Sequence, residues 1–272
     1  MTKGHLIFAQ NSDVDYVRQA YALALTIKKY NTINNVCLVT NDIIPENYKH
    51  VFDYVVNIPF GDSSSKTIWK IENRWKLIYA TPFDETIVYD SDMLLLDSND
   101  SWWNKLSNKD LAFTYNVKDY RGNTIKDHSM RRCIVDNKLP DIYFGIHYFK
   151  KHSIAFEFYK WLEIITKNYK QFYNKFTPIC TQNFCSMDVS SAIALKILDN
   201  PDTYTNNPMS FTHMKKQIQG WPNIPSLWTN AVIANFADNG QLFLSNNLQS
   251  GVFHYTEEQF LTDKIIQTIE KL

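Results

Sequence analysis

The chain has 272 residues, 44% of them hydrophobic, which suffices to bury one sizeable core in a single α/β domain. Its 28 Lys and Arg residues balance 28 Asp and Glu residues, which excludes a global electrostatic field that would draw it onto nucleic acid or an anionic membrane. No apolar run is long enough to span a bilayer, no signal peptide is evident and the four cysteines are scattered, so we expect a soluble, cytoplasmic protein with reduced thiols.

The first part of the chain alternates apolar runs with a segment of helical periodicity. Residues 5–9 form a short apolar run, and residues 14–30 carry apolar side chains at helical spacing. Residues 36–40 and 54–57 are two further candidates for buried strands, each followed by turn-forming residues. Strands that alternate with helices predict an α/β fold with a mainly parallel sheet flanked by helices.

A pair of carboxylates follows the next strand candidate. Residues 65–80 are expected to form a helix that ends before Pro82, and residues 86–89 a strand that runs directly into Asp90-Ser91-Asp92. Ligands of open α/β sheets bind outside the carboxyl ends of the strands, because the loops there vary while the sheet holds them rigidly. The two carboxylates are therefore candidates for a functional site.

The rest of the chain continues the alternation. Strands are expected at 111–115, 142–149, 241–244 and 251–255, and helices at 153–169, 189–198 and 257–271. Asp188 opens the second of these helices, where an acidic residue suits the helix dipole. Residues 119–140 are polar and irregular, as expected of an acceptor loop. We predict one domain over residues 1–272, with a nucleotide-binding part over about 1–115 and an acceptor-binding part over about 116–272.

The spacing and setting of Asp90 and Asp92 indicate a metal site. Two carboxylates separated by one residue can direct oxygen ligands at one hard cation, for which Mg²⁺ or Mn²⁺ is the natural candidate. Apolar residues flank the pair on both sides, so bare charges would be costly without a compensating cation. A divalent ion there can bridge the phosphates of a nucleoside diphosphate and stabilise the charge that develops as it departs. Alternatively, such residues cap a turn or pair with surface lysines.

Several motifs agree in order with a known family. They are Ala9-Gln-Asn-Ser12 after the opening strand, Trp75-Lys76-Leu77 ahead of the DxD strand, Gly145 in an aromatic strand, Met187-Asp188, and His254 in the segment 252–255. Together they resemble the family 8 glycosyltransferases, which include glycogenin and bacterial galactosyltransferases. The resemblance implies a single-domain, Rossmann-like GT-A fold and a retaining transferase that uses a nucleoside-diphosphate sugar as donor.

The resemblance also implies roles for individual residues. It assigns Asp90, Asp92 and His254 to the Mn²⁺ or Mg²⁺ ion. It assigns Ala9 and Asn11 to the nucleotide, and Lys76, Asp90 and Asp188 to the donor. Asp188 is the residue expected to be catalytic, by orienting the donor sugar. Where the family usually has Asn and Ser, this chain has Tyr143 and Phe144, and Thr256 and two glutamates replace the Gly and Lys that follow the metal-binding His.

The acceptor and two other functions stay open at the level of sequence. A saccharide, a protein Tyr and a hydroxylated DNA base are candidate acceptors. The third would use a local basic face formed by Lys126, Arg131, Arg132, Lys138, Lys150 and Lys151. A haloacid-dehalogenase-like phosphatase also ends a strand with D-x-D, although near the start of its fold. The missing Gly and Lys would also suit an inactive module that binds a nucleotide sugar or a glycan.

Overall fold

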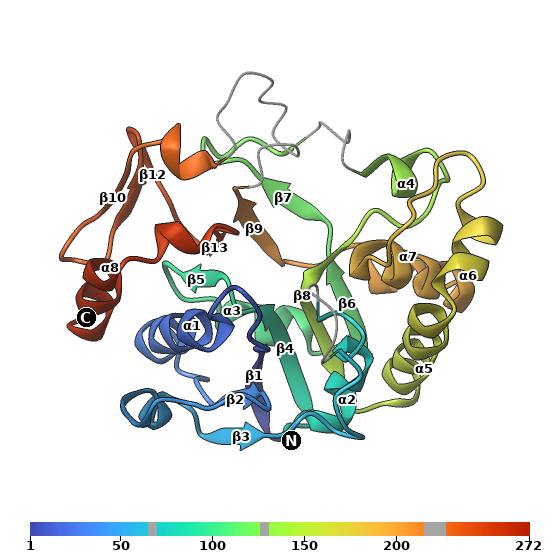
Figure 1. Cartoon of the computed structure of the whole chain (residues 1–272), viewed down its shortest axis with the longest axis horizontal. Helices are drawn as coiled ribbons and strands as arrows, with labels where there is room; N and C mark the ends of the chain where they lie inside the picture. Colours follow the sequence, from blue (N-terminus) through green and yellow to red (C-terminus); the bar gives the residue numbers. More distant parts are fainter. Residues whose placement is uncertain (65–69, 126–130, 215–226) are drawn as a thin grey trace.

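The computed structural model describes residues 1–64, 70–125, 131–214 and 227–272. A six-stranded sheet in the order β3-β2-β1-β4-β8-β6 forms its centre (Figure 1). Its strands are β1 (Lys3–Phe8), β2 (Val36–Val39), β3 (Tyr54–Val56), β4 (Glu85–Asp90), β6 (Leu111–Thr114) and β8 (Tyr143–Lys150). The first four are parallel to one another, whereas β8 runs antiparallel to both β4 and β6. This confirms the predicted α/β fold with a mainly parallel sheet.

Helices cover both faces of this sheet, which explains why its strands read as continuous apolar runs. Successive residues of β1 point to opposite faces: Ile7 packs into one buried cluster with α1 (Tyr16–Tyr30), and Leu6 into another. The helices of the second cluster are α2 (Leu77–Ala80), α4 (Arg132–Val135), α5 (Ser153–Lys167), α6 (Tyr169–Phe176) and α7 (Met187–Leu198). Figure 1 shows α1 on one side of the sheet and α5 and α7 on the other. No helix of the described residues has the length and apolar character needed to cross a membrane.

A second sheet brings the C-terminal part of the chain to the end of β4. Its order is β5-β13-β9-β7, formed by β5 (Met93–Leu95), β13 (Val252–His254), β9 (Ser210–His213) and β7 (Asn116–Lys118). Strand β5 starts one residue after Asp92 and pairs antiparallel with β13, so that Met93 lies opposite His254. A small third sheet contains β10 (Ala234–Phe236), β11 (Leu242–Leu244) and β12 (Asn247–Leu248).

The five predicted helices all differ from the structure in at least one bound. The helix expected over 14–30 begins at Tyr16, and the one expected over 189–198 begins at Met187. Of the helix expected over 65–80, residues 65–69 lie outside the described residues, and the rest holds only a 3-10 turn, Arg74–Lys76, followed by α2. The helix expected over 153–169 ends at Lys167. The final helix, α8 (Asp263–Glu270), begins late because the Thr262 side chain caps it by accepting a hydrogen bond from the Ile265 N–H. The elements that were not predicted include α3 (Ser101–Leu106), the helices α4 and α6, the strands β5, β7, β9, β10 and β12, and the 3-10 turns Glu46–Val51, Pro201–Thr203 and Trp228–Asn230.

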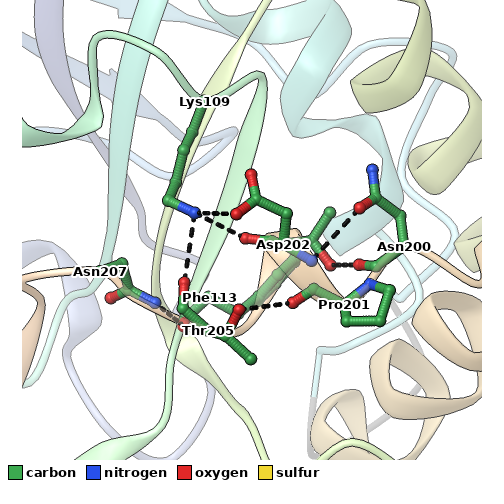
Figure 2. Close-up of polar contacts among 8 residues, drawn as sticks. Lys109, Phe113, Asn200, Pro201, Asp202, Thr205 and Asn207 are labelled. Carbon is green, nitrogen blue, oxygen red and sulfur yellow. Dashed lines mark hydrogen bonds and ion pairs between the residues drawn. The ribbon is translucent and has the colours of Figure 1, made fainter.

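A buried lysine anchors the chain beyond α7 to the central sheet (Figure 2). The Lys109 ammonium, on a residue only 5% exposed, donates to the Asp202 carbonyl at 2.8 Å, the Asp202 carboxylate at 2.7 Å and the Thr205 carbonyl at 3.2 Å. Beside it, the Asn207 amide donates to the Phe113 carbonyl of β6 at 3.0 Å. These contacts fix the turn that follows α7, the helix that carries Asp188.

Candidate functional site

The structure brings Asp90, Asp92 and His254 together at the carboxyl end of β4. One ligand atom from each side chain lies within 4.8 Å of the other two, and the His254 Nε2 is 3.0 Å from the Asp92 Oδ2. The pairing of β5 with β13 produces this arrangement, and the Tyr255 N–H also donates to the Asp92 carbonyl at 3.1 Å. Two carboxylates and an imidazole therefore face one point, although His254 lies far from both aspartates in the sequence.

The close approach of β8 to this cluster requires a glycine. Strand β8 lies beside β4, and a Cβ atom at Gly145 would be 2.6 Å from the Asp90 Oδ2 and 3.2 Å from the Met93 Cε. Any larger residue would push against the carboxylate itself. The glycine thus leaves room for Asp90 to hold its place in the cluster.

A cation from the 3-10 turn before α2 faces the two carboxylates. The Arg74 Nη1 is 3.0 Å from the Asp90 Oδ1, and its guanidinium lies 4.7 Å from the centre of the Phe8 ring. Burial raises the pKa of Asp90; Arg74 opposes this rise, whereas the neighbouring Asp92 adds to it. Burial would also raise the pKa of Asp92, but the adjacent His254, a backbone hydrogen bond and Arg74 together hold that pKa below its ordinary value.

Two hollows adjoin this charged centre, and Arg74 and Asp90 line both of them. The smaller, of about 180 Å³, is further lined by Phe8, Gln10, Tyr16, Lys70, Ser91 and Asp92. The larger, of about 560 Å³, has a more apolar wall that includes Ile71, Phe144, Phe184 and Met187, together with Asp188. A polar ligand and a partly apolar one can therefore meet beside Asp90.

Asp188 occupies a fixed position in the larger hollow. It lies in the first turn of α7, whose N-cap is Ser186. Its Oδ1 accepts a hydrogen bond from the Phe144 N–H at 2.8 Å, and its Oδ2 accepts one from the Arg131 Nη1 at 2.9 Å. The carboxylate is thus held at both oxygens.

Arg131 itself is buried, with only 4% of its side chain exposed. Its Nε donates to the Asp141 carboxylate at 2.8 Å, its Nη2 donates to the Ile142 carbonyl, and its guanidinium lies 3.8 Å from the centre of the Tyr143 ring. Burial alone would lower the pKa of Arg131, but Asp188 and its other neighbours raise it, so the guanidinium stays charged.

Lys76, Ala9 and Asn11 lie outside the linings of both hollows. The Lys76 ammonium is buried and donates to the Gly61 carbonyl, to the Ser63 Oγ at 3.1 Å and to the Asn73 Oδ1 at 2.6 Å. Ala9 is fully buried. The Asn11 side chain accepts a hydrogen bond from the Val17 N–H at 3.0 Å, which secures the start of α1.

Sequence reasoning missed Arg74, Lys70, Tyr16 and the role of Arg131. Arg74 lies two positions before Lys76, and the helix expected over 65–80 gave no means to choose between them. Arg131 was expected on a basic surface, but it is buried among carboxylates. Lys126 of that surface lies outside the described residues.

Lys150, another cation expected on that basic surface, does not lie near Arg131. Arg131 contacts Tyr143 at the start of β8, whereas Lys150 ends the same strand. Seven residue steps along a strand correspond to roughly 23 Å. Arg131 and Lys150 therefore do not belong to one compact basic patch, and the hydroxylated DNA base stays a prediction.

No protein-family model matches this chain, and neither does any curated protein sequence. Among solved structures, the glycosyltransferase GlyE of Streptococcus pneumoniae TIGR4 is similar over 79% of this chain and 46% of its own, with a TM-score of 0.40 and 14% identity. This chain thus spans about half the length of GlyE. The galactosyltransferase LgtC, solved with donor and acceptor sugar analogs, is similar over 99% of this chain and 96% of its own, with a TM-score of 0.49 and 10% identity.

Proposed function

We propose that this chain is a metal-dependent glycosyltransferase of the GT-A type. It transfers a hexose or pentose from a nucleoside-diphosphate sugar to an acceptor hydroxyl, with retention at the anomeric carbon. The observation that carries the proposal is the meeting of Asp90, Asp92 and His254 within 4.8 Å, beside two hollows that share Asp90. This is the edge of the sheet at which open α/β folds bind ligands.

The donor set suits Mn²⁺ or Mg²⁺. Carboxylate oxygens are ligands of both ions, and an imidazole nitrogen favours the transition metal. Once bound, such an ion neutralises the diphosphate and stabilises the negative charge of the leaving group. Asp90 and Asp92 would hold it from the end of β4, and His254 from the end of β13.

The smaller hollow is the proposed nucleotide site. Tyr16 and Phe8 offer ring surfaces to a base, and Arg74 and Lys70 offer positive charge to phosphates. Ala9 and Asn11 lie on either side of Gln10, which lines this hollow, and they remain proposed nucleotide contacts. Lys76 is proposed to act through the loop that it holds in place, because its ammonium donates hydrogen bonds to Gly61, Ser63 and Asn73.

The larger hollow is the proposed site of the donor sugar and the acceptor. Asp188 would orient the sugar there. Its two oxygens already accept hydrogen bonds from Phe144 and Arg131, and a paired carboxylate is a weakened nucleophile. We therefore favour a front-face substitution, in which the leaving phosphate oxygen takes the proton of the acceptor hydroxyl. The apolar wall favours an acceptor that carries an apolar group, whether a saccharide derivative or a protein Tyr.

The first test is a thermal-shift panel of nucleoside diphosphates and nucleotide sugars, with and without Mn²⁺. A ligand that binds the folded state raises the melting temperature by mass action. We expect one nucleotide family to stabilise the wild type only with metal, and Asp92→Ala to abolish the shift. Asp238→Ala removes an exposed carboxylate elsewhere and is the matched control.

Each contrary result points to a different function. If no nucleotide shifts the melting temperature, the transferase proposal fails. Binding without release of diphosphate or free sugar over long incubation would indicate an inactive binding module. Phosphatase activity that depends on Asp90 but not on a nucleotide would favour the haloacid-dehalogenase-like alternative. Retention is checked separately, from the anomeric configuration of the product by NMR.

A further inference from the structure

A hollow of about 440 Å³ lies apart from the two that adjoin Asp90. Its walls come from the end of β7 with the turn that follows, from the segment between β12 and β13, and from the amino ends of β9 and β13. Its lining shares no residue with the linings of the other two hollows. Its volume is large enough for a sugar ring and the sugars linked to it.

Two cations line this hollow without a counterion. Neither Lys118 nor Arg121 forms an ion pair with another residue of the described chain. The Arg121 guanidinium lies 5.0 Å from the centre of the ring of Tyr120, which also lines the hollow. Asp97 is the acidic residue of the lining, and its carboxylate accepts a hydrogen bond from the Gly251 N–H at 3.0 Å. The hollow therefore has an excess of positive charge.

Two buried polar side chains of the lining have unused hydrogen-bonding capacity. Thr212 is 7% exposed, and its hydroxyl makes no hydrogen bond within the described ranges. Gln249 is 6% exposed, and its amide nitrogen donates to the Tyr120 carbonyl at 2.8 Å and the Asn247 carbonyl at 2.9 Å. These two bonds fix the orientation of the Gln249 amide. Its oxygen accepts no hydrogen bond from the described residues. Both side chains can therefore accept a hydrogen bond from a ligand in the hollow, and the Thr212 hydroxyl can also donate one.

The positions of these groups relative to the sheet fit one ligand. Lys118 and Thr212 are register partners on the parallel strands β7 and β9, so their side chains leave the sheet on the same face. A positive charge thus lies beside a hydroxyl that can both donate and accept. This combination recognises a molecule that carries an anionic group next to hydroxyls.

The hollow is separated from the proposed metal site by protein. Val252 lines it, and His254 lies two residues further along β13, a rise of roughly 7 Å. Phe211 also contributes to its lining, and the Phe211 ring is 5.8 Å from the ring of His254, measured between centroids. A ligand can therefore bind here without contacting Asp92.

We propose that this hollow binds an acidic saccharide. Its carboxylate or phosphate would face Lys118 and Arg121, and its hydroxyls would hydrogen-bond to Thr212 and to the Gln249 carbonyl oxygen. Because the assignment uses none of the residues at Asp90, it stands or falls independently of the glycosyltransferase proposal.

The test is isothermal titration calorimetry with trigalacturonate and sialyllactose, each against its neutral counterpart, trigalacturonate methyl ester or lactose. We expect an acidic saccharide to bind the wild type at least about tenfold more tightly than its neutral counterpart. Removing both charges with Lys118→Ala and Arg121→Ala should lower the affinity for the acidic saccharide about tenfold and hardly alter that for the neutral one. Thr212→Val should weaken both a few-fold, by about one hydrogen bond.

Three controls keep the result interpretable. The pair Lys170→Ala and Lys175→Ala removes two exposed charges from α6 and should leave the affinity unchanged. Asp92→Ala should also leave it unchanged. For the wild type itself, raising the salt from about 0.05 M to about 0.5 M should weaken binding of the acidic saccharide.

Several results would overturn the assignment. One is the absence of saturable binding of both acidic saccharides to the folded wild type. Others are an unchanged affinity in the Lys118 and Arg121 double variant, or no effect of salt. Loss of binding in Asp92→Ala would place the saccharide at the Asp90 centre instead.

Discussion

The buried guanidinium of Arg131 donates a hydrogen bond to the Asp188 carboxylate at 2.9 Å, while the Phe144 N–H donates to its other oxygen at 2.8 Å. Phe144 is followed by Gly145, the residue that packs against Asp90. The two carboxylates proposed to handle the donor are therefore linked through two consecutive residues of β8. A change at Arg131 should consequently alter the reaction even though it lies outside both hollows.

Replacing Arg131 tests this link. Lysine keeps the charge but cannot bond to Asp188, Asp141 and the Ile142 carbonyl at once, so we expect Arg131→Lys to lower kcat about 10- to 100-fold, with a smaller change in donor KM. In Arg131→Ala, added guanidinium ion should restore part of kcat. Arg132→Lys, at an exposed neighbour, is the control. Equal loss in both lysine variants, or no rescue, would contradict a positioning role.

Gly145→Ala should disable the metal site. The new Cβ would lie 2.6 Å from the Asp90 Oδ2, so either the carboxylate or β8 must shift, at a cost of about 1–3 kcal/mol in the free energy of unfolding. We expect Mn²⁺ affinity, measured by calorimetry, to fall at least about tenfold.

Gly61→Ala serves as its control. This glycine has a φ of +77° and no atom within 4 Å of a built Cβ, so alanine there is strained but does not crowd a ligand. It should destabilise the fold and leave Mn²⁺ affinity intact. Wild-type affinity in Gly145→Ala would show that Asp90 does not bind the ion.

The free energy of unfolding should fall as the pH drops below about 6.5, because two histidines are buried in their neutral form. Burial lowers the pKa of His147 to about 3 and that of His5 to about 4, from an ordinary value of 6.5. Between these values the unfolded chain binds protons that the folded protein does not, so acid favours unfolding, by at most about 1.4 kcal/mol per pH unit for each histidine.

Urea denaturation at pH 7.5 and pH 5 measures this effect. The His147 Nδ1 lies 2.8 Å from the Phe144 carbonyl, which can only accept, so Nδ1 carries the proton of the neutral ring. His147→Gln removes one titrating group and should reduce the difference between the two pH values, whereas the exposed His50→Gln should not. An unchanged difference in His147→Gln would refute the assignment.

Lys109→Met should destabilise the protein without altering nucleotide binding. It removes the donor shared by the Asp202 carbonyl, the Asp202 carboxylate and the Thr205 carbonyl. The Asp202 side chain is largely exposed and can turn to water, so we expect a loss of about 1–3 kcal/mol in the free energy of unfolding. Lys105→Met, at an exposed position in α3, should cost little. Equal effects would show that the buried contacts contribute nothing measurable.

Local patterns in the sequence predicted most strands of the central sheet and their surroundings. β1, β2 and β4 were expected within a few residues of their observed bounds, because strands buried on both faces read as continuous apolar runs. The DxD pair could be placed at a strand end for the same reason. By contrast, β5, β7 and β9 have only three or four residues each, too few for a period to stand out.

The hydrophobic pattern of a sequence depends only on residues that are close together in the chain. Such a pattern can indicate the strands of the parallel sheet and the position of Asp90 and Asp92 at their carboxyl ends. The partners of these aspartates come from elsewhere: His254 lies 162 positions after Asp92, and Arg74 comes from a 3-10 turn 16 positions before Asp90. Likewise, Arg131 reads as a surface cation until the packing of β8 against α7 surrounds it with carboxylates. These contacts depend on how distant segments pack to bury apolar surface and to pair buried charges. No local pattern in the sequence encodes that packing.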